Sequence, residues 1–179
     1  LVGSEMCIRD RFEVDKFGVN GRKQGERSAA RDMKLSTKGR YGLKAMVDLA
    51  TEYDSGARLS IAQLAERQGV SAAYLEQLIA SLKKAGLVTA LRGVQGGYVL
   101  ARSPELISVG EVLRVLEGST AIVDCVGTTG TDCSNVCSCS ARPLWLKLQR
   151  RIDDVLNTTS VRDLADDYIT QMERNQDNK

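Results

Sequence analysis

Apolar residues recur with a helical period along residues 36–86, and three short helices are predicted there. Ser60, with Gln63 three residues on, forms a capping box for the second helix, which ends at Gly69. Ser71 caps the third helix, which ends at Gly86. The inward face of the first helix consists of Leu43, Met46, Val47 and Ala50, and that of the third of Leu75, Leu78, Ile79 and Leu82. A turn of about three residues between the second and third helices is typical of a helix-turn-helix.

Two β-strands are predicted after the third helix. "LVTAL" (87–91) and "YVLA" (98–101) are apolar, and "RGVQGG" (92–97) joins them. The glycines permit a tight turn that can approach phosphates closely. Helix, turn, helix and β-hairpin in this order predict a winged helix, because each piece supports the others.

The pattern returns to helices in the second half of the chain. Ser108 and Glu111 form another capping box, and Ser160 with Asp163 caps a last short helix. Between them lies a long amphipathic helix whose apolar stripe consists of Leu144, Trp145, Leu148, Ile152, Val155 and Leu156. The expected fold class is therefore mainly α with a small β-hairpin.

Five segments follow from this pattern. The expected segments are a leader at 1–32, a winged-helix domain at 33–118, a cysteine-rich loop at 119–142, the long and short terminal helices at 143–168, and a frayed tail at 169–179. Within the leader, residues 1–11 include "SEMCIRDR", which resembles a translated transposon adapter used in library preparation. Residues 12–32 show no helical or strand period. We expect Met33 to be the true start and residues 1–32 to be non-native or disordered.

The composition indicates a globular protein with uneven charge. The chain is 42% hydrophobic, no apolar run approaches the roughly eighteen residues of a membrane helix, and no signal peptide is recognisable, so a cytoplasmic location is expected. Residues 33–104 hold ten Lys and Arg against five Asp and Glu, whereas residues 105–179 hold eight against twelve. A basic front half suggests a polyanionic partner, and with the winged helix this favours DNA.

The open face of the third helix is the predicted DNA-reading surface. Its N-terminal residues would contact base edges. Gln77 can read adenine bidentately, and Glu76 can accept a hydrogen bond from a cytosine amino group. The residues expected to contact double-stranded promoter DNA are Lys38, Arg40, Ser71, Ala73, Tyr74, Glu76, Gln77, Lys83, Arg92 and Gln95.

Four cysteines stand within fifteen positions, with the spacing C-x7-C-x3-C-x-C: Cys125, Cys133, Cys137 and Cys139. Disulfides are disfavoured in a reducing compartment, and neighbours one residue apart bridge poorly. A four-cysteine zinc site normally shows two C-x2–4-C pairs, and here only the second pair comes close. The residues alone favour an iron–sulfur cluster only slightly over zinc, and both remain open.

Several stretches resemble one family of bacterial transcription regulators. "MKLSTKGRYGLKAMVDLA", "SAAYLEQLIASLKKAGLV", "RGVQGGYVL" and "VGEVLRVLEG" look like the winged-helix regulators typified by IscR, NsrR and CymR, over about residues 33–168. The resemblance implies a homodimer on palindromic promoter DNA. It also implies that the third helix enters the major groove, that Arg92 enters the minor groove, and that the long helix pairs across the dimer.

The same resemblance implies a cluster held by Cys125, Cys133 and Cys139. IscR-like members of the family bind a cluster through three cysteines in this loop and a histidine just before "LW", where this chain has Arg142. The fourth ligand is therefore Cys137, a carboxylate, solvent or a group from the partner subunit. A [2Fe–2S] cluster is favoured, and a [4Fe–4S] cluster is the alternative.

Other functions fit the residues less well. A regulator of cysteine metabolism like CymR would act without a cluster, because CymR-like members lack this cysteine loop. A zinc-stabilised DNA-binding module would not sense anything. An enzyme is disfavoured, because the chain contains no histidine and no nucleophile–base constellation.

Overall fold

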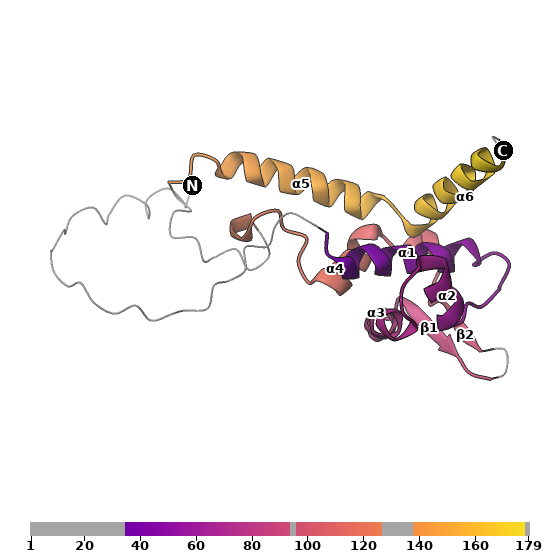
Figure 1. Ribbon diagram of the computed structural model, residues 1–179. Helices are drawn as coiled ribbons and strands as arrows, with labels where there is room; N and C mark the ends of the chain where they lie inside the picture. Colours follow the sequence, from indigo (N-terminus) through magenta and orange to yellow (C-terminus); the bar gives the residue numbers. More distant parts are fainter. Residues whose placement is uncertain (1–34, 94–95, 127–137, 178–179) are drawn as a thin grey trace, which may run out of the picture.

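The computed structural model describes residues 35–93, 96–126 and 138–177, and the remaining segments are drawn in grey in Figure 1. In the described part, the winged-helix elements form one body from which two long helices extend (Figure 1). The elements, in chain order, are α1 (Thr37–Thr51), α2 (Ile61–Gln68), α3 (Ala72–Lys84), β1 (Val88–Leu91), β2 (Gly97–Leu100), η1 (Pro104–Leu106), α4 (Val109–Glu117), η2 (Asp124–Val126), α5 (Arg142–Thr158) and α6 (Val161–Asp177). The predicted fold class is confirmed.

The helix-turn-helix begins and ends where its caps predict. Ser60 and Gln63 form a reciprocal capping box at α2, and Gly69 ends this helix with φ +65°, a left-handed conformation that favours glycine. Ser71 caps α3 by accepting a hydrogen bond from the Tyr74 N–H. The buried apolar faces of α1, α2 and α3 meet in one core. Removing these side chains from water is the main stabilising contribution to the domain.

The hairpin is antiparallel and docks on the chain before α2. Its register pairs Val88 with Leu100 and Leu91 with Gly97. Leu59 extends the hairpin by exchanging two backbone hydrogen bonds with Tyr98, of 2.8 and 3.3 Å. The residues between the two strands, 92–96, are called the wing below, and residues 94 and 95 lie outside the described residues. The strand β2 that follows the wing is bonded to Leu59, just before α2.

Helices α4, α5 and α6 join the two halves of the chain. α4 lies against α1 and α5, and α6 packs on α1 with Val161 and Ala165 fully buried. Val161 N–H donates to the Ile107 carbonyl at 2.8 Å. Arg162 holds α6 to the domain through ion pairs to Asp54 (2.8 Å) and Glu105 (2.9 Å).

Two boundaries differ from the sequence-based expectation. The expectation of a short last helix followed by a frayed tail from 169 is wrong, because α6 has 17 residues and runs to Asp177. The apolar period of α6 continues past Ala165 through Tyr168, Ile169 and Met172, so the sequence pattern itself extends beyond the expected end of the helix. α5 begins at Arg142, inside the expected loop at 119–142.

α1 and α4 approach so closely that a side chain at Gly42 would collide with Leu116. A Cβ atom at Gly42 would lie 2.3 Å from Leu116 Cδ1. We expect Gly42→Ala to destabilise the protein by about 1 kcal/mol, because overpacking costs about 1–3 kcal/mol and better helix propensity returns up to about 1 kcal/mol. Thermal or denaturant unfolding measures this.

The matched control removes the obstacle. In a Leu116→Ala background, Gly42→Ala should be neutral or stabilising, because only the gain in helix propensity remains. Stabilisation by Gly42→Ala in the otherwise unchanged chain would contradict the close approach.

Candidate DNA interface and cysteine site

α3 divides cleanly into a core face and an open face. Leu75, Leu78, Ile79 and Leu82 are buried, and between them Glu76 and Gln77 are exposed. The other exposed residues of the open face are Ala72, Ala73, Ala80, Ser81, Lys83 and Lys84, preceded by Ser71. The residues expected to read bases therefore lie together on the face opposite the core.

Tyr74 differs from the other expected contacts on α3. Its ring meets Tyr41 edge to face, with centroids 6.2 Å apart and planes at 89°. Its hydroxyl is buried and has no hydrogen-bond partner among the described residues. Tyr74 thus packs α3 against α1, and its hydroxyl does not lie on the open face.

The start of α1 brings a second group of cations near α3. Lys38 and Arg40 are both exposed, as a phosphate contact requires. Arg40 and Lys44 also lie over the Tyr41 ring, at 5.9 and 5.5 Å from its centroid. Lys44 was missed by the sequence reasoning, although its place four residues after Arg40 puts both on one helix face.

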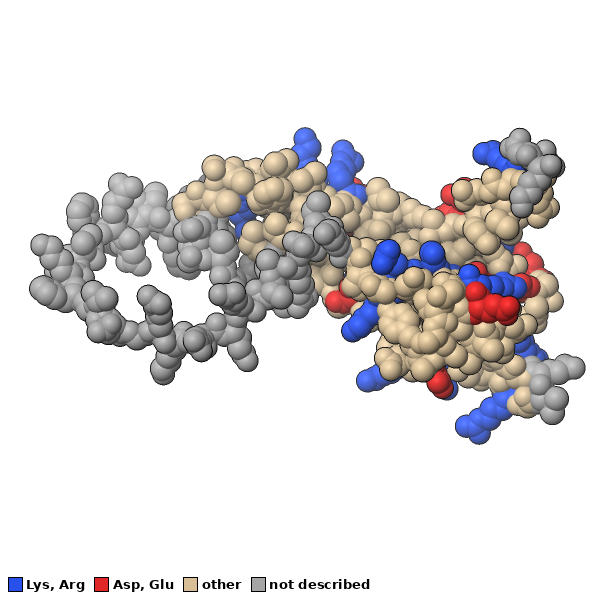
Figure 2. All heavy atoms as spheres, in the orientation of Figure 1, with Lys and Arg blue, Asp and Glu red and all other residues tan. Residues whose placement is uncertain are grey.

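The wing supplies a third cation. Arg92 is exposed directly after β1, and Gly93 adopts φ +114°. Gln95 lies outside the described residues. Figure 2 shows Lys and Arg side chains projecting from α1, from α3 and beside the wing. The exposed cations of these elements, called the basic surface below, are of the kind that pairs with DNA phosphates. They are Lys38, Arg40, Lys44, Lys83, Lys84 and Arg92.

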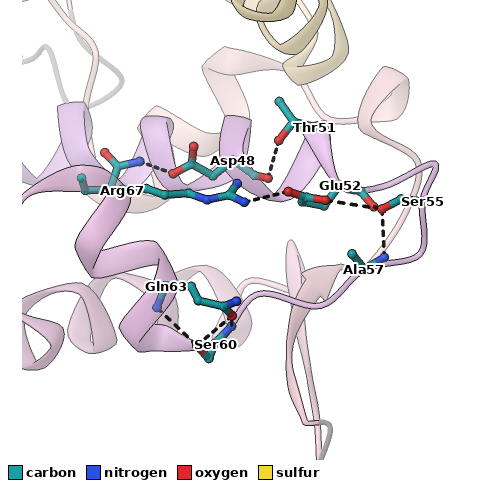
Figure 3. A network of polar contacts seen from close by, with 9 residues as sticks. Asp48, Thr51, Glu52, Ser55, Ala57, Ser60, Gln63 and Arg67 are labelled. Atoms are coloured by element: carbon teal, nitrogen blue, oxygen red, sulfur yellow. Dashed lines mark hydrogen bonds and ion pairs between the residues drawn. The ribbon is translucent and has the colours of Figure 1, made fainter.

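A polar network fixes α2 against α1 (Figure 3). Arg67 pairs with Glu52 at 2.8 Å, and the Gln68 side-chain amide donates to the Asp48 carboxylate. Asp48 is buried, and this burial raises the pKa of its carboxyl above the usual value. The network sets the position of the first helix of the helix-turn-helix, on which the orientation of α3 depends.

Two of the four clustered cysteines lie within the described residues, and both are unpaired and half-buried. Cys125 is in η2, and Cys139 lies three residues before α5 begins. Arg142 contacts both: its Nη1 donates to the Cys125 carbonyl at 3.0 Å, and its backbone N–H donates to the Cys139 carbonyl at 3.3 Å. Cys133 and Cys137 lie outside the described residues.

Arg142 occupies the position where the resemblance to IscR-like regulators implies a histidine. Its guanidinium has only donors and cannot bind a metal. It bonds the Cys125 backbone carbonyl, so this contact does not involve the Cys125 sulfur. Half-exposed thiols are accessible to a thiophilic metal or cluster, so the donor chemistry fits such a group. Among the described residues, no three His, Cys, Asp or Glu side chains form a metal site.

Gln149 anchors the segment between α4 and η2, residues 118–123, to α5. This side chain is 8% exposed. Its Oε1 accepts from the Ile122 N–H at 2.9 Å, and its Nε2 donates to the Thr120 carbonyl at 3.4 Å and to Asp153 at 2.9 Å. Sequence reasoning missed Gln149 because it lies 27 residues from Ile122, with no local signal.

The apolar stripe of α5 is only partly covered. Leu144, Leu148 and Val155 are 52%, 39% and 62% exposed. Trp145, Ile152 and Leu156 are half-buried. A helix with such an exposed stripe indicates a protein–protein contact. No helix in the described part of the chain is long and apolar enough to cross a membrane.

Comparison with known proteins identifies the same family. Residues 35–167 match the model of the Rrf2 family, described as iron-dependent transcriptional regulators. The chain is 39% identical over 133 residues to the HTH-type transcriptional regulator CymR of Bacillus subtilis, covering 74% of this chain and 90% of that protein. It is 40% identical over 139 residues to IscR of Aliivibrio salmonicida, covering 78% and 81%.

A solved structure agrees with this assignment. The IscR structure from T. potens is 44% identical, superposes with a TM-score of 0.60, and covers 75% of this chain and 88% of that one. These relatives are regulators and not enzymes, as the sequence predicted. The chain belongs to the Rrf2 family of DNA-binding transcriptional regulators.

Proposed function

We propose that this protein is an iron–sulfur cluster-sensing regulator that binds palindromic promoter DNA as a homodimer. The observation that carries the proposal is the pair of accessible thiols, Cys125 and Cys139, held at the start of α5 by Arg142. Similarity to IscR proteins, 40% identical in A. salmonicida, supports it.

Cys125, Cys133 and Cys139 would hold the cluster, and Cys137 would replace the histidine that Arg142 displaces. When bound, the cluster supplies a redox-active centre that iron limitation, oxygen or nitric oxide can alter. Arg142 fixes the backbone of Cys125, and Gln149 fixes residues 120–122 beside it. These contacts orient the site relative to α5. A cluster changes the affinity for DNA only when it binds the DNA-competent and the DNA-incompetent conformations with different free energies. The change in the free energy of DNA binding is limited by that difference.

The DNA-binding part of the proposal rests on the open face of α3 and the basic residues around it. Glu76 and Gln77 would read bases in the major groove, with Ser71, Ala73 and Lys83 beside them. Lys38 and Arg40 would contact phosphates, and Arg92 and Gln95 of the wing would reach the minor groove. A dimer through α5 would place two such faces on a palindrome.

A second candidate is a regulator that acts without a cluster. Similarity to CymR of B. subtilis over 90% of that protein favours it. In a zinc-stabilised DNA-binding module, the four cysteines would bind zinc in place of a cluster. Cluster loading separates these candidates directly.

Cluster loading tests the assignment of the cysteines. Anaerobic reconstitution of the full chain with iron and sulfide should produce visible absorbance and change its affinity for promoter DNA. Cys125→Ala, Cys133→Ala and Cys139→Ala should each abolish the colour, because each removes a thiolate ligand. Cys7→Ala is the matched control and should keep it.

Two outcomes would count against this reading. A colourless protein with one zinc per chain and unchanged DNA binding excludes cluster sensing. A stable cluster in Cys139→Ala together with its loss in Cys137→Ala shows that the ligand assignment is wrong.

A substitution in the wing tests the role of Arg92. Arg92→Ala should weaken binding to promoter DNA by about fivefold or more, because one charge-assisted contact is worth about 1 kcal/mol or more. Binding is measured by fluorescence anisotropy across a salt series. Arg151→Ala is the matched control, since this exposed arginine of α5 lies outside the basic surface. Equal losses in the two variants would contradict a specific role for Arg92.

A substitution in the apolar stripe of α5 tests the dimer. Leu148→Glu should shift the protein to monomers in sedimentation experiments, because it places a charge in the apolar stripe of α5. Lys147→Glu changes the charge at the neighbouring exposed position and should leave the dimer intact. A Leu148→Glu protein that stays dimeric would remove α5 from the interface.

A further inference from the structure

Glu117, the last residue of α4, caps the start of α1 from a distant part of the chain. Its Oε1 accepts three hydrogen bonds: from Ser36 N–H at 3.0 Å, from Ser36 Oγ at 2.6 Å and from Gly39 N–H at 3.0 Å. A carboxylate at this place satisfies free N–H groups and interacts favourably with the positive end of the helix dipole.

The chain makes room for this contact. Gly39 is buried, and a Cβ atom there would lie 2.3 Å from Glu117 Oε1. The carboxylate therefore sits directly against the α1 backbone. Any shift of the end of α4 must move the start of α1 or break these hydrogen bonds.

The chain that follows Glu117 runs directly to Cys125. Gly118, with φ +81°, ends α4 and begins the segment 118–123, which is hydrogen-bonded to Gln149 at Thr120 and Ile122. Cys125 lies eight residues after Glu117, with its carbonyl bonded to Arg142. A rearrangement around Cys125 consequently acts on Glu117 through a short stretch of chain anchored to α5.

The start of α1 belongs to the basic surface. Gly39 lies between the exposed Lys38 and Arg40, and Arg40 contacts the Tyr41 ring. Tyr41 in turn packs edge to face on Tyr74 of α3. The Glu117 contact therefore sets the position of residues that would face DNA.

We propose that Glu117 is a positioning residue that couples the segment 118–126 to the DNA-facing start of α1. The DNA-facing role of α1 rests on the proposed function, whereas the coupling itself rests on the contacts of Glu117 and Gln149. Release of the segment loosens the Glu117 cap, and α1 then presents Lys38 and Arg40 less well. Coupling of this kind is reciprocal, so DNA binding also stabilises the held segment.

The test combines two changes in the full chain without added iron. Gln149→Leu releases the segment, Glu117→Ala removes the cap, and the double variant completes the cycle. Amide hydrogen exchange is followed at residues 36–40, and promoter affinity is measured in parallel. In the otherwise unchanged chain, Gln149→Leu should raise exchange at 36–40 and lower affinity by about threefold or more, a modest coupling. In the Glu117→Ala background it should change neither.

Several controls separate coupling from simple loss of structure. Exchange at residues 64–68 of α2 should be unaffected by Gln149→Leu, which excludes global unfolding as the cause. Glu117→Gln keeps a carbonyl acceptor and should give an intermediate response. Glu173→Gln neutralises an exposed glutamate of α6 and should behave like the unchanged chain. Equal effects of Gln149→Leu with and without Glu117, or no effect at 36–40, would overturn the proposal.

A cluster experiment keeps the two proposals distinguishable. The ratio of promoter affinity with cluster to promoter affinity without cluster is measured in the unchanged chain and in Glu117→Ala. Where this ratio differs from one in the unchanged chain, it should be close to one in Glu117→Ala. The same ratio in Glu117→Ala overturns the coupling and leaves cluster sensing intact. If the chain takes up no cluster, the proposed function is wrong. Hydrogen exchange in the Gln149→Leu and Glu117→Ala double-mutant cycle still tests the coupling.

Discussion

Helix α1 can meet α4 only because two of its residues have no side chain. Gly39 faces the Glu117 carboxylate and Gly42 faces Leu116, each with a would-be Cβ contact of 2.3 Å. α1 also contacts α2, α3, β2 and α6, so it forms the centre of the domain. Since packed interiors transmit small displacements instead of absorbing them, the position of α1 relative to α4 affects every element of the basic surface.

The parts of this structure that the sequence predicted are those with local causes. Ser60, Ser71 and Ser108 cap helices through bonds to residues three positions away, and Gly69 ends α2 by its own backbone conformation. The open face of α3 follows from helical period alone.

The contacts that the sequence did not predict link residues far apart in the chain. Glu117 lies 81 residues from Ser36, and Gln149 lies 27 residues from Ile122. Nothing in either neighbourhood signals the partner. The edge-to-face contact of the Tyr74 ring with Tyr41 likewise joins residues of two different helices. The length of α6 is a different case, because its apolar period continues locally through Tyr168, Ile169 and Met172 and the sequence could have predicted it.

α5 serves two purposes on opposite faces. At 100° per residue, Arg142, Gln149 and Asp153 fall within about 40° of one another, and this face holds the segment before η2. The exposed residues Leu144, Leu148 and Val155 fall on the other side of the helix. One rigid element therefore carries the anchors of the cysteine site on one face and the proposed dimer contact on the other, without competition between them.

The contacts of the cysteine site are weaker than those of the domain that it adjoins. Among the described residues, hydrogen bonds with the Arg142 and Gln149 side chains tie residues 120–125 to α5, and each contributes about 0.5–1.5 kcal/mol net. The α1–α4 contact instead borders a continuous apolar core. A free-energy change of 1–3 kcal/mol, typical of coupling between sites, is comparable to those hydrogen bonds and far below the energy of that core. A ligand at the cysteines could thus rearrange the segment while the winged helix stays folded, which a regulatory switch requires.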